Sequence, residues 1–476
     1  MSGLALTLDA TLASTGGRVA RAGATTSWER VGIDGRAARR GDLYVAIKGQ
    51  THDGHAFLAQ AVAAGATGVI VERGRAPAEG ELGGITVIEV DDGVAALSAL
   101  GRWARRKSGA RVVAITGSTG KTTTKTLIAA MLRAAVGDDA VLATEGSFNN
   151  ETGVPLTLLG LRTTHTHAVI EMGMRGLGQI DDLCRIAEPD VGVLLNAGIT
   201  HVGVVGSAAA IAAGKSEVFA RLPATGRAIF PADDPRLAPL AIVRGVPADR
   251  HITFGDGADA TVRVASATSR GERGWEATIE VRRGATVETL ALVLPLVGRH
   301  NVGNAACALA VAVALELPLG ACLTGLAAAR PAKQRSELST VAGRRTLVDC
   351  YNASPHSTTA ALATLADLRA SGAGRAVAVL GDMLELGDEE TAAHAAIGRA
   401  AAAAGIDALI TVGDRARHAA DAARAAGVPR VEAYPPDAIA DATARVLEWS
   451  SPGDWLLVKA SRGMRLERVI DALEKA

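Results

Sequence analysis

One short run constrains this chain more than any other feature. It reads Thr-Gly-Ser-Thr-Gly-Lys-Thr-Thr at 116–123, and it stands between an apolar stretch, 112–115, and a stretch with a helical pattern, 124–133. A glycine-rich turn between a strand and a helix lets backbone N–H groups and the positive helix N-terminus face a polyphosphate. The run therefore predicts a phosphate-binding loop, with Lys121 directed at the terminal phosphates and the Thr122 hydroxyl at Mg²⁺.

The spacing of this loop is shorter than the general pattern, which has a glycine where Ile115 stands. The alternative is an ordinary turn between a strand and a helix. The Lys-Thr-Thr that directly follows Gly120 favours the phosphate loop.

Composition limits the remaining possibilities. A chain of 476 residues predicts two to four domains, and 50 basic against 50 acidic side chains give no net charge, which argues against a nucleic-acid-binding surface. The 4 cysteines are scattered and form no CxxC pair, so we expect buried, reduced thiols and a cytoplasmic location. The N-terminus lacks a signal-peptide pattern, and no run of about 18 apolar residues predicts a membrane span. We expect a monomer.

The pattern of apolar runs predicts an α/β fold of three domains. A small α/β domain occupies 1–108, and a central domain with a buried parallel sheet occupies 109–330, with an antiparallel extension at 252–296. A doubly wound, Rossmann-like domain without a phosphate loop of its own occupies 331–476. The basic run 102–107 is predicted to be the solvated end of a helix, where cations complement the helix dipole.

Polar residues follow the buried strands of the central part. Glu171 ends one strand, and His201 lies in the loop after the next. Carboxyl ends of parallel strands face the ligand crevice, so Glu171 and His201 are candidate Mg²⁺ ligands beside Thr122, although magnesium prefers oxygen to imidazole. A capping carboxylate and an ordinary loop histidine are the alternatives. Lys215 follows in a helical stretch, and from the residues alone a solvated lysine is favoured there.

Further strings follow the loop in a fixed order. They are Asn-Asn-Glu-Thr-Gly-Val-Pro at 149–155, His-Asn-Val-Gly-Asn-Ala at 300–305, Asp349-x-Tyr351-Asn352, Gly-Asp-Met-Leu-Glu-Leu-Gly at 381–387 and Lys-Ala-Ser-Arg-Gly at 459–463. Together with the loop, whose short spacing is usual there, they resemble the Mur ligases. These are ATP-dependent ligases that build the peptide of bacterial cell-wall precursors.

The resemblance implies a role for each domain. The first would bind a UDP-MurNAc-peptide, the central one would bind ATP, and the third would complete the ligase. The strings at 171–174, 381–387 and 459–465 resemble the member that joins D-alanyl-D-alanine to UDP-MurNAc-tripeptide through an acyl phosphate. ADP, phosphate and the pentapeptide precursor of peptidoglycan would be the products.

The resemblance also implies site residues. Lys121, Lys215 and His201 would be catalytic, and Lys215 would carry a carbamate from CO₂ that supports a second Mg²⁺. Metal ligands would be Thr122, Glu171, His201 and Lys215. ATP would be bound by Gly117, Ser118, Thr119, Gly120, Lys121, Thr122, Thr123, Asn304, Arg335, Asp349 and Tyr351. The substrate would be bound by Asp34, Arg36, Asn149, Asn150, Thr152 and Asn352.

Two departures and two alternatives accompany this assignment. Gly35 stands between Asp34 and Arg36 where the family has serine, and Ser354 replaces an asparagine. Another Mur-type or a folylpolyglutamate-type amide ligase is the first alternative. The second is of another class, a P-loop switch or motor ATPase that acts on a partner protein without a small acceptor.

Overall fold

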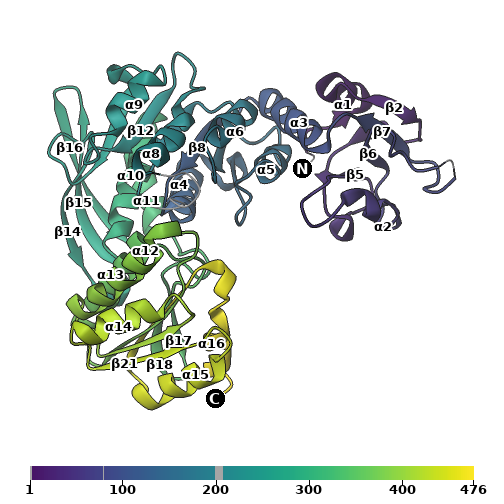
Figure 1. Cartoon of the computed structure of the whole chain (residues 1–476). Helices are drawn as coiled ribbons and strands as arrows, with labels where there is room; N and C mark the ends of the chain where they lie inside the picture. Colours follow the sequence, from purple (N-terminus) through teal and green to yellow (C-terminus); the bar gives the residue numbers. More distant parts are fainter. Residues whose placement is uncertain (1–2, 79, 199–206) are drawn as a thin grey trace.

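The structure is a computed structural model that describes residues 3–78, 80–198 and 207–476. Figure 1 shows three lobes, with the N-terminal and the C-terminal lobe each attached to a central one. No helix in these residues is long and apolar enough to cross a membrane. All four cysteines are buried and free. The α/β fold with three domains is as predicted, while the exact boundaries at 108 and 330 stay predictions.

The N-terminal lobe contains a five-stranded sheet in the order β2-β7-β6-β5-β4, parallel except for β2. The small α/β domain expected here is confirmed, and three of its strands, β1, β3 and β4, have only two residues each. The elements are β1 (Leu6–Thr7), α1 (Leu8–Thr15), β2 (Arg18–Arg21), β3 (Ser27–Trp28), β4 (Val31–Gly32), β5 (Leu43–Val45), α2 (Leu58–Ala63), β6 (Gly68–Glu72), β7 (Thr86–Val90) and α3 (Gly93–Ser108).

The central lobe is built on a nine-stranded sheet in the order β16-β15-β14-β13-β12-β11-β8-β10-β9. Its strands are β8 (Arg111–Thr116), β9 (Val141–Ala143), β10 (His167–Glu171), β11 (Val191–Leu194), β12 (Arg227–Pro231), β13 (His251–Gly255), β14 (Val262–Ser269), β15 (Trp275–Arg283) and β16 (Thr286–Leu294). The antiparallel extension begins later than predicted, because β13 pairs in parallel with β12 and β14 pairs in parallel with β13. Buried and partly buried residues alternate along β13. The same alternation is typical of a half-buried antiparallel strand, which is why the sequence pattern misplaced the start of the extension.

Alternate residues of β8 pack on opposite faces of this sheet. Val113 and Ile115 belong to the core under α4 and α10, while Val112 and Ala114 belong to the core on the other face. This double burial fixes the strand that leads into the predicted loop. The helices are α4 (Lys121–Val136), α5 (Gly153–Leu159), α6 (Gln179–Ala187), α8 (Ala208–Lys215), α9 (Leu237–Val243), α10 (His300–Ala314) and α11 (Leu319–Ala327).

The C-terminal lobe has a six-stranded sheet in the order β17-β18-β22-β19-β20-β21, parallel except for β17. The predicted doubly wound arrangement is confirmed, with helices packed on both faces. The elements are β17 (Glu337–Val341), β18 (Arg344–Val348), α12 (Pro355–Ala370), β19 (Ala376–Gly381), α13 (Glu390–Ala403), β20 (Ala408–Val412), α14 (Arg417–Ala425), β21 (Arg430–Tyr434), α15 (Ile439–Trp449), β22 (Trp455–Lys459) and α16 (Glu467–Leu473).

The basic end of α3 is not simply solvated, and that prediction was wrong. Arg102 and Arg106 donate to the Glu188 carboxylate, at 2.8 and 2.6 Å. Arg105 pairs with Asp190 at 2.9 Å and is largely buried. Basic residues are favoured at the C-terminal end of a helix by the helix dipole, whether or not they also form ion pairs. The sequence of this run therefore could not show that its ion pairs attach α3 to the central lobe.

Candidate active site

The predicted phosphate loop joins β8 to α4 and is held by Asn196, which follows β11. Asn196 Oδ1 accepts hydrogen bonds from the backbone N–H groups of Ser118 and Thr119, at 3.1 and 3.0 Å. Its Nδ2 donates to the Thr119 carbonyl at 3.0 Å. Gly120 has a φ of 82°, a left-handed conformation that favours glycine. One asparagine side chain and one glycine thus shape the turn.

Lys121 begins α4 and reaches back across the loop. Its Nζ donates to the Gly117 carbonyl at 2.7 Å. Burial lowers the pKa of Lys121, the Glu171 carboxylate raises it, and the Arg335 guanidinium lowers it again. The Gly117 carbonyl oxygen is a neutral partner for this ammonium. A polyphosphate bound at the loop would provide an anionic one.

The Glu171 carboxylate, at the end of β10, lies close to several polar side chains. Thr122 Oγ1 donates to Glu171 Oε2 at 3.0 Å, and Asn149 Nδ2 donates to Glu171 Oε1 at 2.9 Å. Lys125 Nζ lies 3.7 Å from Oε2. Sequence reasoning missed Lys125, although its position one helical turn after Lys121 places it on the same face of α4.

The hydroxyl of Thr122 and the carboxylate of Glu171 are oxygen ligands of the kind that Mg²⁺ prefers. They lie in contact beside the loop, so these residues fit a magnesium ion there. No group of three or more His, Cys, Asp or Glu side chains that could hold a metal is found in the described part of the chain. His201, the third predicted ligand, lies in 199–206, outside the described residues.

Lys215 ends α8 and is buried, with an exposed fraction of 2%. Burial and the nearby charge of Lys121 lower the pKa of Lys215 to about 7. The expectation of a solvated lysine was therefore wrong. Neighbouring Gly214 permits this packing, because a Cβ there would lie 2.8 Å from Met174 Cε and 2.9 Å from Leu177 Cδ2.

Residues of the C-terminal lobe face the loop across the domain boundary. The Arg335 guanidinium lies 4.1 Å from the centre of the Tyr351 ring, and the Tyr351 hydroxyl contacts Ser147 Oγ. Asp349 accepts from Lys459 Nζ at 2.6 Å. From the central lobe, Asn304 stands beside the loop, since a Cβ on Gly120 would lie 3.2 Å from Asn304 Oδ1.

Comparison with known proteins gives matches for all three lobes. Three family models match: "Mur ligase family, catalytic domain" at residues 28–105, "Mur ligase middle domain" at 115–312 and "Mur ligase, glutamate ligase domain" at 334–462. The UDP-N-acetylmuramoyl-tripeptide–D-alanyl-D-alanine ligase of Bacillus subtilis (strain 168) is 35% identical over 446 residues, which covers 93% of this chain and 92% of the relative.

This chain belongs to the Mur ligase family.

Two solved structures extend the match to the whole Mur ligase fold. The crystal structure I of MurF from Acinetobacter baumannii superposes with a TM-score of 0.87 at 30% identity and covers 100% of both chains. The MurF ligase from Thermotoga maritima in complex with ADP gives a TM-score of 0.78 at 26% identity, covering 94% of this chain and 97% of that one.

The predicted substrate residues of this Mur ligase form groups separate from the loop. Asp34 and Arg36 pair with each other at 2.9 Å on the N-terminal lobe, with side chains 46% and 77% exposed. Asn150 Oδ1 accepts from Gly153 N at 2.9 Å and from Thr152 Oγ1 at 3.2 Å, at the start of α5. Asn352 Oδ1 accepts from the next backbone N–H. Of the predicted substrate residues, only Asn149 shares a hydrogen bond with the site around Glu171.

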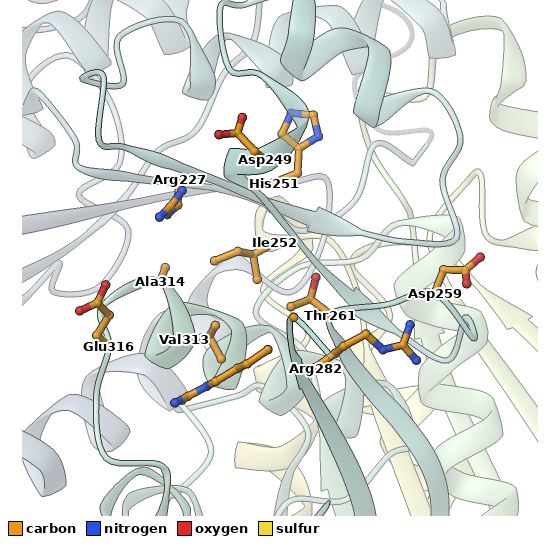
Figure 2. Close-up of a pocket in the computed structure, with 12 residues that line it drawn as sticks. Arg227, Asp249, His251, Ile252, Asp259, Thr261, Arg282, Val313, Ala314 and Glu316 are labelled. Atoms are coloured by element: carbon orange, nitrogen blue, oxygen red, sulfur yellow. The ribbon is translucent and has the colours of Figure 1, made fainter. Parts of the chain in front are cut away.

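Two cavities flank the central lobe. One of about 690 Å³ lies between α4, the segment after β9 and the C-terminal lobe. The other, of about 480 Å³, is drawn in Figure 2. Its residues include Arg227 and His251, the first residues of β12 and β13, and Glu316 just after α10. This second cavity is therefore at the amino ends of the strands, opposite the edge that carries the phosphate loop.

Proposed function

We propose that this Mur ligase joins D-alanyl-D-alanine to UDP-N-acetylmuramoyl-tripeptide with ATP. The observation that carries the proposal is the group of Lys121, Thr122 and Glu171 at the loop, in a chain whose relatives bear that name over nearly their whole length. Asn304 of the central lobe lies beside Gly120 of the loop, and the charge of Arg335, from the C-terminal lobe, acts on Lys121. This supports a ligase that binds its nucleotide from two lobes.

The chemistry begins with a poor electrophile. A peptide carboxylate is anionic and has no leaving group, so one of its oxygens attacks the γ-phosphate of ATP and ADP departs. The amine of the dipeptide then attacks the acyl carbon, and phosphate leaves with the former carboxylate oxygen as the amide forms. Because two anions must meet in the first step, catalysis is mainly charge neutralisation and positioning.

Lys121 supplies the cation at the terminal phosphates. Thr122 and Glu171 would hold Mg²⁺, which would neutralise phosphate charge when bound. Asn149 orients Glu171 through the bond to Oε1, and Asn196 keeps Ser118 and Thr119 in the turn. Asn196 accepts from the backbone N–H groups of Ser118 and Thr119. The N–H groups of residues 120–123, at the N-terminus of α4, remain available to bind phosphate.

Lys215 would act after carbamylation. Its amine nitrogen attacks the carbon of CO₂, a proton leaves the nitrogen, and an anionic carbamate results. A carbamate oxygen can join a magnesium site, which an ammonium cannot do. Carbamylation requires the neutral amine, and the lowered pKa of about 7 supports it by making that form common near neutral pH.

The remaining assignments complete the proposal. Asp34 and Arg36 would bind the uridine nucleotide, and Asn150, Thr152 and Asn352 the sugar-peptide. Asn304, Arg335, Asp349 and Tyr351 would bind ATP from two domains, so closure on ligand binding is expected. His201 stays a proposed metal-side residue, and the monomeric state and cytoplasmic location stay expectations.

Phosphate release with a panel of acceptors tests the function. We expect release only when ATP, UDP-MurNAc-tripeptide and D-alanyl-D-alanine are all present. Release with a folate and glutamate would favour the folylpolyglutamate-type alternative. Rapid ATP hydrolysis without any acceptor would favour a switch or motor ATPase and would contradict the proposal.

A further inference from the structure

The buried ion pair of Glu171 and Lys125 has no part in the proposed chemistry. Lys125 Nζ lies 3.7 Å from Glu171 Oε2, and the two side chains are 6% and 3% exposed. The same ammonium donates to the Gly146 carbonyl at 3.4 Å. Among the described residues, Lys125 is the one basic side chain in an ion pair with this carboxylate. Because a buried carboxylate without a cation is strongly destabilising, Lys125 keeps Glu171 charged and in place.

One carboxylate oxygen is shared by the ammonium and by the proposed metal site. Thr122 Oγ1 donates to Glu171 Oε2, the atom that Lys125 faces, whereas Asn149 Nδ2 donates to Oε1. Mg²⁺ lies about 2.1 Å from its ligand oxygens, so an ion on Oε2 would be at most about 6 Å from this ammonium. Two cations that close in a buried site repel each other strongly. The ammonium and a metal ion therefore compete for Oε2.

The backbone of Lys125 is fixed, but its ammonium is not. Leu127 and Ile128 are fully buried in the core on one face of the central sheet, and they hold α4 in place. A lysine ammonium sits on a flexible four-carbon stem, so it can turn away from a carboxylate without any movement of the helix. Lys125 also borders the cavity of about 690 Å³, which gives the ammonium room to turn.

We propose that Lys125 is a positioning residue that acts through Glu171: it occupies the place of a metal ion there until the nucleotide binds. The inference rests on the Mg²⁺ site of the proposed function, at Thr122 and Glu171. Mg²⁺ is usually bound by one or two carboxylates together with substrate phosphates, so ATP would bring the metal and give the ammonium a new anionic partner. The free enzyme therefore binds divalent metal weakly, and the nucleotide complex binds it tightly.

Lys125→Gln removes the charge but keeps an N–H donor for the buried carboxylate. The probe is Mn²⁺, which prefers the same oxygen ligands, and the electron paramagnetic resonance signal of free Mn²⁺ measures its binding. Without nucleotide, the variant should bind Mn²⁺ about 10- to 100-fold more tightly than the unmodified enzyme, because one repulsive charge is gone. Lys125→Arg keeps the charge and should gain little. A residue that only supported the fold would lose affinity when changed.

Matched variants define the result. Arg133→Gln removes the same charge from the exposed last turn of α4 and should leave Mn²⁺ affinity unchanged. Adding Glu171→Gln to Lys125→Gln should abolish the gain, and a gain that persists would place the metal away from Glu171 and overturn the inference. Unchanged or weaker Mn²⁺ binding by folded Lys125→Gln would also overturn it.

A measurement on the unmodified enzyme needs no variant to fold. Its Mn²⁺ affinity should rise steeply when ADP is added, and tight binding that is indifferent to ADP would overturn the role of Lys125. None of these measurements involves the dipeptide. An enzyme that shows the predicted Mn²⁺ behaviour but does not consume D-alanyl-D-alanine would therefore overturn the proposed function alone.

Discussion

Two lysines of the central lobe, the half-buried Lys121 and the buried Lys215, have opposite surroundings. Lys121 donates to a carbonyl of its own loop at 2.7 Å, and the Glu171 carboxylate opposes the loss of its charge. Lys215 has neither a hydrogen bond nor an ion pair with any described residue, and Lys121 adds a repulsive charge. Burial alone therefore does not define a lysine's chemistry. Burial lowers the pKa of both amines, but only Lys121 has a carboxylate that opposes this shift. We propose that Lys121 serves as a cation for phosphate and Lys215 as a neutral amine.

The largest expected effect is the loss of ATP turnover when the Lys121 ammonium is removed. Lys121→Ala should fold normally, because its side chain donates to a carbonyl of its own loop and bridges no other element, among the described residues, by a hydrogen bond. It should nevertheless lose ATP turnover by roughly 10²–10³ or more. Single-turnover phosphate release measures the loss, and far-ultraviolet circular dichroism checks the fold. Near-normal turnover in a folded variant would remove the loop from the mechanism.

Lys215→Ala sharpens the contrast between the two lysines. If Lys215 supplies a carbamate oxygen, the variant should be impaired about as severely, and acetate or formate should restore part of the rate by returning an oxygen anion. Lys121→Ala is the matched control, since a carboxylate cannot replace a cation there. Equal rescue of both variants, or an active Lys215→Ala enzyme indifferent to bicarbonate, would break the comparison.

Glu171 tests the metal side of the same site. Glu171→Gln keeps the side-chain shape but removes a charged oxygen ligand, so the Mg²⁺ concentration for half-maximal rate should rise about tenfold. Titration of magnesium at saturating ATP measures it. An unchanged magnesium requirement would show that Glu171 only holds Thr122 and Asn149 in place.

The smallest effect concerns stability and pH. The folded pKa of Lys215 is about 7 against an ordinary 10.5, so the folded state binds fewer protons between those values and stability rises with pH across that window. In CO₂-free buffer, Lys215→Met should raise the melting temperature most at pH 7 and below, by about 2–4 °C per kcal/mol recovered. The gain should shrink toward pH 10.5.

The matched control for that series is Lys107→Met, since Lys107 is exposed at the end of α3. It should shift the melting temperature little at any pH. A gain for Lys215→Met that does not vary with pH would mean that the lysine is charged in the folded protein throughout.

The sequence predicted the loop and the sheets because those features are local. A strand, a glycine turn and a helix in order specify the loop, and apolar runs specify buried strands such as β20 and β22. The burial of Lys215 could not be predicted in this way. It depends on Gly214 meeting Met174 and Leu177 across the fold, and a glycine before a lysine carries no such signal.

Contacts between lobes could not be predicted from the sequence either. Arg105 and Asp190 are 85 residues apart, and the basic run of α3 satisfies helix rules without its acidic partners. Likewise, Lys125 was overlooked because a lysine within α4 is ordinary until Glu171 is placed 3.7 Å away. What sequence patterns miss here are pairings created by the tertiary fold.

The most direct test of the account follows one oxygen atom. UDP-MurNAc-tripeptide labelled with ¹⁸O in its terminal carboxylate is incubated with the enzyme, ATP and D-alanyl-D-alanine, and the released phosphate is analysed by mass spectrometry. Activation of the carboxylate by the γ-phosphate predicts that each phosphate carries one ¹⁸O atom. Unlabelled phosphate would mean that water, not the peptide carboxylate, receives the phosphoryl group, and would contradict the proposed ligase chemistry.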